Sequence, residues 1–321
     1  MCSGERTSGV CCHGPGAGVT EASSPVGTRR GLFFGWLGML LFSGTVVATR
    51  FAVRELDATF IALGRALVAA ALAACVLWFR GAPWPHRDQW RRIALVAGGV
   101  VVGFPWLITL ALRTMPAAHG AVIVGLLPMA TSVLAVIRGG ERPSPAFWAA
   151  SGAGLLGILV FASTRGAHGL GQADLLALGA VLLGAIGYCE GGLLAREMPA
   201  AHVICWALVL SAPFLAPPTA WVVTRVGVSA GPAAWAGFAY VAVLSMFLGF
   251  FAFYRGMAEA GIARVSQIQL AQPICSLVWS ALFLGERIDA STALAALFVV
   301  GCVLVTSRTR VRVAYAVPEA P

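Results

Sequence analysis

Two ionisable side chains, Arg65 and Glu190, lie inside long apolar segments of this 321-residue sequence. A charge inside a membrane span is costly and marks a candidate functional site. Arg65 is about 8 Å from the predicted outer end of its segment and Glu190 about 6 Å from the inner end of its own, so we do not expect them to pair. For Arg65, gating or anion binding is one interpretation, and snorkelling to the interface is the other. For Glu190, the alternatives are proton coupling or cation binding, and snorkelling.

Four uncharged side chains are candidates for contact with a substrate: Gln272, Gln269, Trp106 and Tyr188. The Gln272 amide both donates and accepts hydrogen bonds, which suits a polar or zwitterionic solute. Gln269 lies on nearly the same helical face, whereas we expect Gln267 to lie nearer the interface. Hydrogen bonding between helices is the alternative for the glutamines, and anchoring at the membrane interface is the alternative for the aromatic rings.

The remaining reactive residues form no catalytic or metal-binding pattern. The sequence has no HExxH motif, no phosphate-binding loop and no Gly-x-Ser-x-Gly motif. Five of the 8 cysteines lie in apolar segments, where cysteine behaves as a small hydrophobe, and no disulfide framework is apparent. Cys11-Cys12-His13 is not followed by a second pair of metal ligands. We therefore expect no enzymatic activity, no cofactor and no metal.

The segments that carry these residues are suited to a membrane. The chain is 59% hydrophobic and 11% charged, with a mean hydropathy of +0.85, whereas about a quarter of the residues in a soluble domain are charged. A membrane-spanning helix needs about 20 apolar residues. We therefore predict an all-α polytopic membrane protein with ten spans, at about 32–49, 60–79, 93–112, 117–137, 146–162, 175–194, 203–223, 235–254, 262–284 and 290–306.

The 22 basic residues, all of them arginine, fall mainly in alternate loops between these spans. Basic residues gather on the cytoplasmic side of a membrane, so we predict a multi-pass protein of the cell (plasma) membrane with both termini in the cytoplasm. Residues 1–30 are predicted to be a disordered cytoplasmic tail, and residues 308–321 a second tail. The charges form no compact patch of the kind that binds nucleic acid.

The two halves of the sequence repeat one another. Pro128 is followed 13 residues later by Glu141, and Pro273 is followed 13 residues later by Glu286, each glutamate within a Gly-Glu-Arg triplet. We therefore predict two repeats, 31–163 and 174–307. Five spans per repeat is an odd number, so the second repeat enters the membrane from the opposite side, an arrangement typical of secondary transporters.

Both prolines fall near the middle of their spans, where each frees a backbone carbonyl. In lipid, a freed carbonyl must face protein or a water-filled cavity. We therefore expect Pro128 and Pro273 to break their helices beside a central cavity, near a pivot. A kink used only for packing is the alternative.

Several features of the sequence resemble the EamA-domain branch of the drug/metabolite transporter superfamily over about residues 32–306. They are the Phe42-Ser43-Gly44 stretch followed by Arg50, Arg65 within ALGRALVAAAL, and the two proline to Gly-Glu-Arg hairpins. The resemblance implies ten helices in two inverted five-helix repeats, and the transport, often export, of small metabolites such as amino acids or drug-like compounds. In the family a Trp-Gly pair is common at Ser43-Gly44, and an acidic residue is often found at Gln272.

The sequence thus predicts a secondary active transporter that exports a small molecule by alternating access. A membrane-embedded enzyme or a lipid-handling protein is the alternative, although an enzyme would need His, Asp or Glu clustered at one depth. The expected partners are a small-molecule substrate and the lipid bilayer, with no nucleic acid. A homodimer is left open.

Overall fold

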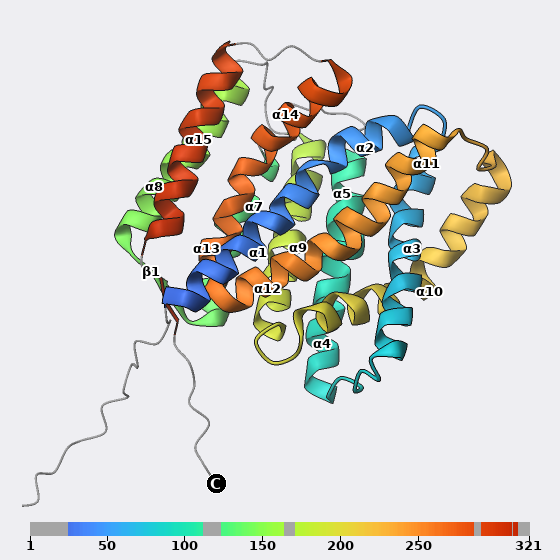
Figure 1. The fold of residues 1–321 in the computed structure, drawn as a ribbon, viewed down its shortest axis with the longest axis horizontal. Helices are drawn as coiled ribbons and strands as arrows, with labels where there is room; N and C mark the ends of the chain where they lie inside the picture. The colour runs from blue at the N-terminus through green and yellow to red at the C-terminus, as the bar shows by residue number, and fades with distance from the viewer. Residues whose placement is uncertain (1–24, 112–122, 164–170, 286–289, 310, 314–321) are drawn as a thin grey trace, which may run out of the picture.

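A computed structural model describes residues 25–111, 123–163, 171–285, 290–309 and 311–313 (Figure 1). The described chain consists of helices and one pair of short strands, so the predicted helical class is confirmed. The strands β1 (Glu141–Pro143) and β2 (Val311–Val313) pair antiparallel, with Arg142 opposite Arg312. The sequence did not predict this pairing of the C-terminal segment with the loop after the fourth predicted span.

The helices of the first half follow the predicted spans closely. Their bounds are α1 Pro25–Ser43, α2 Thr45–Ala52, α3 Ala58–Phe79, α4 Arg87–Val96, a π-helical turn η1 Ala97–Gly103, α5 Phe104–Ala111, α7 Leu127–Gly139 and α8 Pro145–Ser163. The first helix starts earlier than predicted, because Thr28, Arg29 and Arg30 continue it beyond the apolar segment. Arginine is a good helix former, so the end of the hydrocarbon does not stop the helix. Residues 1–24 of the predicted tail lie outside the described residues.

The second half has a similar order of helices in the described residues. Its helices are α9 Gln172–Leu194, α10 Ala200–Val226, α11 Pro232–Ala239, a π-helical η2 Tyr240–Gly249, α12 Phe250–Ala260, α13 Ile262–Ser266, a 3₁₀ turn η3 Gln267–Ala271, α14 Gln272–Leu284 and α15 Ala290–Arg308. The two π-helical turns begin 143 residues apart, at Ala97 and Tyr240. The internal repeat therefore extends to irregular backbone that the sequence pattern did not reveal.

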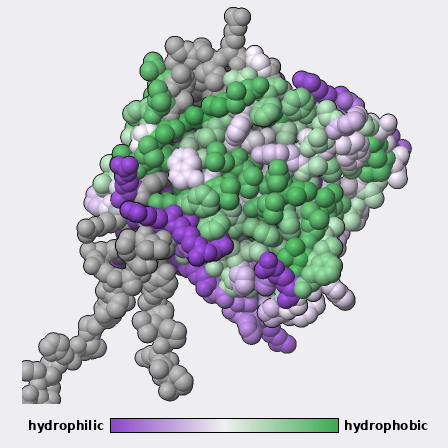
Figure 2. Space-filling view, in the orientation of Figure 1, coloured by the Kyte–Doolittle hydropathy of each residue, from purple (hydrophilic) through white to green (hydrophobic). Residues whose placement is uncertain are grey.

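Six helices in the described ranges are long and apolar enough to cross a membrane: Thr28–Ala52, Ala58–Phe79, Arg87–Ile108, Gln172–Leu194, Ala200–Val226 and Pro232–Ala260. The apolar helix α7 is shorter. The other four of the ten predicted spans stay predictions. Figure 2 shows a broad apolar surface in green, with hydrophilic residues gathered mainly along the lower rim. We call this rim, which holds β1 and the start of α4 in Figure 1, the inner end. It is the end predicted to face the cytoplasm.

The main helix contacts join the two halves. Helix α1 packs along α12, and α9 packs along α4, η1 and α5. Helix α3 packs on α10, α7 on α13, and α8 on α15, the last pair standing side by side in Figure 1. Exchanging the halves converts the α1–α12 contact into the contact of α9 with η1 and α5, and it leaves the α3–α10 and α8–α15 pairs unchanged. Glycines allow the closest approach, since a Cβ on Gly256 of α12 would lie 2.6 Å from the backbone nitrogen of Gly35 in α1.

The helices α7 and α14 begin and end alike. Helix α7 follows a turn at residues 125–126, and α14 follows η3, and each has its proline, Pro128 or Pro273, in the first turn. Proline is favoured there because the first helical amides need no partner within the helix. Each helix ends at a glycine with positive φ, 62° at Gly140 and 69° at Gly285, a conformation that glycine adopts without strain.

Candidate functional site

Two of the predicted substrate ligands, Tyr188 and Gln269, lie together deep in the bundle. Tyr188 of α9 is 9% exposed and Gln269 of η3 is 7% exposed, and the Tyr188 hydroxyl lies beside the Gln269 side chain. Among the described residues, the Gln269 Oε1 atom has no hydrogen-bond partner although it is buried. Buried polar atoms are nearly always paired, so this oxygen is an acceptor that the described protein leaves unused.

Tyr188 of α9 belongs to a group of aromatic rings that comes from three helices, α1, α9 and α12. Its ring stacks on Phe250 at a centroid distance of 5.8 Å and meets the edge of Phe253 at 5.5 Å. Phe42 of α1 contacts Phe250 and Phe253 edge to face, at 5.0 and 5.5 Å. We call Phe42, Tyr188, Phe250 and Phe253 the aromatic cluster. It draws on both halves of the chain, and Phe250 directly follows the π-helical turn η2.

The structure does not bring the other candidates to this cluster. Gln272 is half-buried in the first turn of α14. The Trp106 ring is 61% exposed and has no ring contact with another described aromatic residue. Arg65 is half-buried in α3, and no ion pair joins it to a charged group in the described part of the chain.

Gln267, which we expected near the interface, is 1% exposed at the crossing of α7 and α13. That expectation was wrong because Gln267 has partners inside the bundle. Its Nε2 donates to the Pro128 carbonyl at 3.2 Å and to Ser132 Oγ at 2.8 Å, and Ser132 Oγ lies 3.1 Å from Ser266 Oγ. These hydrogen bonds join the two halves beside the start of α7.

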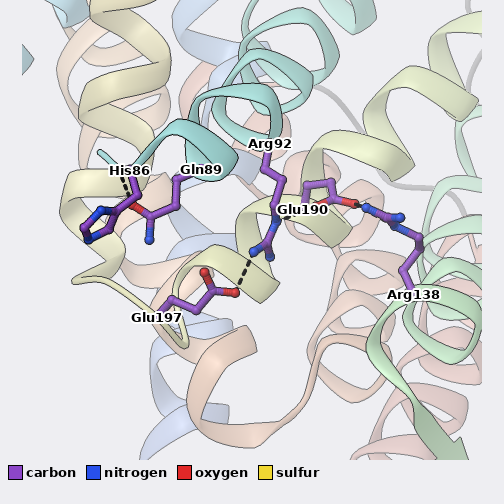
Figure 3. Close-up of polar contacts among 6 residues, drawn as sticks. All are labelled: His86, Gln89, Arg92, Arg138, Glu190 and Glu197. Carbon is purple, nitrogen blue, oxygen red and sulfur yellow. Dashed lines mark hydrogen bonds and ion pairs between the residues drawn. The ribbon is translucent and has the colours of Figure 1, made fainter. Parts of the chain in front are cut away.

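Glu190 is the centre of a charge network at the inner end (Figure 3). Its side chain is 3% exposed, and it accepts hydrogen bonds from Arg92 Nε of α4 at 3.0 Å and from Arg138 Nε of α7 at 2.9 Å. Arg92 also donates to Glu197 at 2.5 Å. Glu190 therefore does not pair with Arg65, as expected. It is held by two arginines that the sequence had suggested only as markers of orientation.

Glu141 forms the second buried contact of the inner end. The residue is 0% exposed, and its carboxylate accepts from the backbone amides of Ile262 at 2.7 Å and Ala263 at 2.8 Å, as well as from the Arg196 guanidinium. The carboxylate thus caps the first turn of α13, where amides lack partners within the helix. The repeated Gly-Glu-Arg triplet was the sequence signal for this role.

Each of these ion pairs joins one half of the chain to the other. Arg92, Arg138 and Glu141 belong to the first half, and Glu190, Arg196 and Glu197 belong to the second. The pairing of β1 with β2 adds a backbone connection beside Glu141. We call the six charged residues the inner-end network. In this conformation the network holds the two halves together at the inner end.

The described residues include no group of three or more His, Cys, Asp or Glu side chains that could hold a metal ion. The aromatic cluster and Gln269 place aromatic rings beside one unpaired acceptor, the two kinds of group that commonly line sites for small organic molecules. The inner-end network offers paired charges, which suit the closing of one end of the bundle.

The chain is similar to known proteins. The chain is 38% identical over 281 residues to "Uncharacterized transporter YdeK" of Bacillus subtilis (strain 168), covering 88% of this chain and 98% of that protein. It is 22% identical over 279 residues to an "Uncharacterized transporter" of Archaeoglobus fulgidus, covering 84% and 95% of the two chains. A solved structure named only "Crystal structure of protein" shares the fold, with a TM-score of 0.73, 18% identity and coverage of 87% of this chain and 98% of that chain.

The sequence profile of the EamA-like transporter family matches twice, at residues 29–163 and 171–308. The two matches together cover most of the chain, and they fall on the two halves whose helices pack against each other. The resemblance noted in the sequence is therefore confirmed, and the helical bundle is the two-repeat membrane fold of this family. The chain is a multi-pass membrane protein that belongs to the EamA-like transporter family of the drug/metabolite transporter superfamily.

Proposed function

We propose that this protein is a secondary active transporter that exports small metabolites, amino acids or drug-like compounds, across the plasma membrane by alternating access. Both termini face the cytoplasm, and the two repeats enter the membrane in opposite directions. The observation that carries the proposal is the inner-end network, in which each ion pair joins one repeat to the other. Contacts between repeats at one end are those that must break when that end opens.

The polar crossing of α7 and α13 supports a pivot near Pro128. Gln267 and Ser266 both donate to the Pro128 carbonyl, at 3.2 and 3.3 Å, from the opposite repeat. A contact deeper in the bundle moves less than a contact at its end when two bodies rock, so these hydrogen bonds can persist while the network separates. Discontinuous helices at the interface of two repeats are a recurring feature of secondary transporters.

Glu190 is the acidic group that opening of the inner end would change most. In the closed arrangement two arginines hold its carboxylate. When the repeats part, both arginines leave with the first repeat and the carboxylate faces the cytoplasm, where it can take a proton or a cation. The sequence contains no nucleotide-binding motif, so an ion gradient is the expected source of energy.

Flux measurements test this function. A panel of labelled amino acids and dyes is added to the medium around everted vesicles that contain the protein, with and without a proton gradient. We expect gradient-dependent accumulation of at least one compound. We also expect Glu190→Gln to change its dependence on the gradient, and Asp88→Asn, which removes an exposed carboxylate of α4, to leave it unchanged. The proposal would be contradicted if correctly inserted protein moves no compound, either with or without the proton gradient.

A further inference from the structure

We propose that Gln269 and the aromatic cluster form a binding site for an aromatic amine, with the amine N–H donating to Gln269 Oε1. This assignment rests on the proposed function and narrows its substrate class. It predicts that the transported solute has a flat apolar body and an amine with at least one hydrogen, and that a quaternary ammonium analogue binds less well.

The unpaired oxygen of Gln269 defines the polar half of the ligand. Oε1 is an acceptor with no donor among the described residues, and the residue is 7% exposed. A side-chain amide rarely stays buried with its oxygen unmatched. A ligand completes this site by bringing an N–H or O–H donor, and a ligand that brings another acceptor would leave two acceptors facing one another.

The aromatic cluster defines the apolar half. Tyr188 and Phe250 stack nearly parallel, at 17°, and Phe253 and Phe42 stand edge to face around them. Aromatic rings pack favourably with other rings through offset or edge contacts, and a ring face attracts a cation. An aromatic amine satisfies both preferences, which makes an amine a better donor here than a neutral hydroxyl.

The position of the site suits a transported ligand. Gln269 lies about 10 Å from the first residue of α13, and Tyr188 about 9 Å from the last residue of α9, by the helical rise. Both residues keep a small exposed fraction at that depth. Gln269 lies in a 3₁₀ turn and Phe250 follows a π-helical turn, and such irregular helix segments often mark functional sites.

The site lacks formal charge. Gln269 and the four residues of the aromatic cluster are all uncharged, and Glu190 is held by its two arginines. A cationic amine would therefore be bound by dipoles and ring faces, without a carboxylate that retains it. Placing a carboxylate at residue 269 should strengthen binding of the cation, which gives the assignment a change that improves affinity as well as one that removes it.

Calorimetric titration of the purified, detergent-solubilised full-length protein tests this site without requiring transport. The two probes are 2-phenylethylamine and its trimethylammonium analogue, which keeps the ring and the charge but has no N–H. We expect the analogue to bind roughly tenfold more weakly to the wild type, the effect of leaving one buried acceptor unmatched. Gln269→Leu should weaken binding of the amine by about the same factor and bring the two probes to similar affinity.

Two further variants keep the test decisive. Gln269→Glu should bind the amine more tightly than the wild type. Ser151→Ala, which removes another buried and unpaired polar atom, Ser151 Oγ in α8, should bind both probes as the wild type does. Equal affinity of the wild type for the two probes, or unchanged binding of the amine by a folded Gln269→Leu variant, would overturn the assignment.

Flux of the same amine in everted vesicles separates the two proposals. Binding of the amine that depends on Gln269, together with no flux of the amine or of any panel compound, would contradict the transport function and still support the binding site. Gradient-driven flux of the amine that is unchanged in Gln269→Leu would support the transport function and contradict the proposed binding site.

Discussion

Replacing Glu190 by Gln should open the inner end. The carboxylate has a side chain that is 3% exposed and accepts three hydrogen bonds, one from Arg92 and two from Arg138. Glutamine has nearly the same shape but no charge, and it offers one oxygen instead of two. The substitution therefore removes the contribution of Glu190 to the attraction between the repeats, and it leaves Arg92 and Arg138 without the counter-charge that they share.

The size of the effect follows from the exposure of the partners. A hydrogen bond to a charged group contributes about 1.5 kcal/mol at the lower end of its range, so three would amount to about 4–5 kcal/mol if all the partners were buried. The Arg138 side chain is 54% exposed and Arg92 is 21% exposed, so water replaces part of the lost interaction. About 2 kcal/mol should remain, which shifts the balance between the closed and open inner end about 30-fold.

Cys189 provides the assay. It is 1% exposed and lies among charged groups of the inner-end network, including Glu190, Glu141 and Arg138. A variant that keeps Cys189 as its single cysteine is labelled with a maleimide in right-side-out and everted vesicles. We expect Glu190→Gln to raise the labelling rate at least tenfold, and to do so from the cytoplasmic face.

Two controls make the result specific. Asp88→Asn and Arg91→Gln each remove one charge from an exposed position of α4, and neither should change the labelling rate. If Glu190→Gln labels at the wild-type rate in folded protein, the network does not hold the inner end closed. Faster labelling from the outer face alone would show that the orientation is reversed.

Three further predictions concern the fold and are checked by thermal unfolding in detergent. Gly256→Ala should lower the melting temperature because its Cβ would lie 2.6 Å from a backbone nitrogen of α1, whereas Gly152→Ala, with no atom within 4 Å of its Cβ, should not. Glu141→Gln should lower the free energy of unfolding by about 3 kcal/mol, since a buried charge pair and an amide contact of α13 are lost together. Arg142→Gln is the control, and equal melting temperatures for the two variants would argue against this role of Glu141. Asp57→Ala should lower the free energy of unfolding by about 1 kcal/mol, because the Asp57 carboxylate accepts hydrogen bonds from two amides at the start of α3, at 2.8 and 3.0 Å. An unchanged stability would mean that this cap is not formed.

The sequence predicted the helical class, the repeat and the family because each depends on a regular signal. Apolar segments of about 20 residues indicate membrane helices, and the matched proline to Gly-Glu-Arg spacing indicates duplication. The matched π-helical turns at Ala97 and Tyr240 were not predictable in this way. An extra residue in a helical turn leaves no mark on hydropathy, since the apolar character of the segment continues through it.

The contacts of the charged residues were harder to predict than their positions. Arg92 and Arg138 are ordinary members of basic loops by sequence, and only the packing of α4 and α7 against α9 brings them to Glu190. Gln267 was misjudged for the same reason, because its partners lie 135 or more residues away in the chain. Gln269 and Tyr188 were identified separately as candidates, and their proximity follows from the fold.

The packing between halves bears on how the protein is made. Because α1 lies along α12, α3 along α10 and α8 along α15, the helices of the first repeat reach the membrane before their main partners have been synthesised. The helices of the first repeat therefore complete their packing only after the second repeat has entered the membrane. The pairing of β2 with β1 forms last, when residues 311–313 have been synthesised. Two half-chains produced separately in one cell should find each other, while either produced alone should be cleared by the membrane's quality-control proteases.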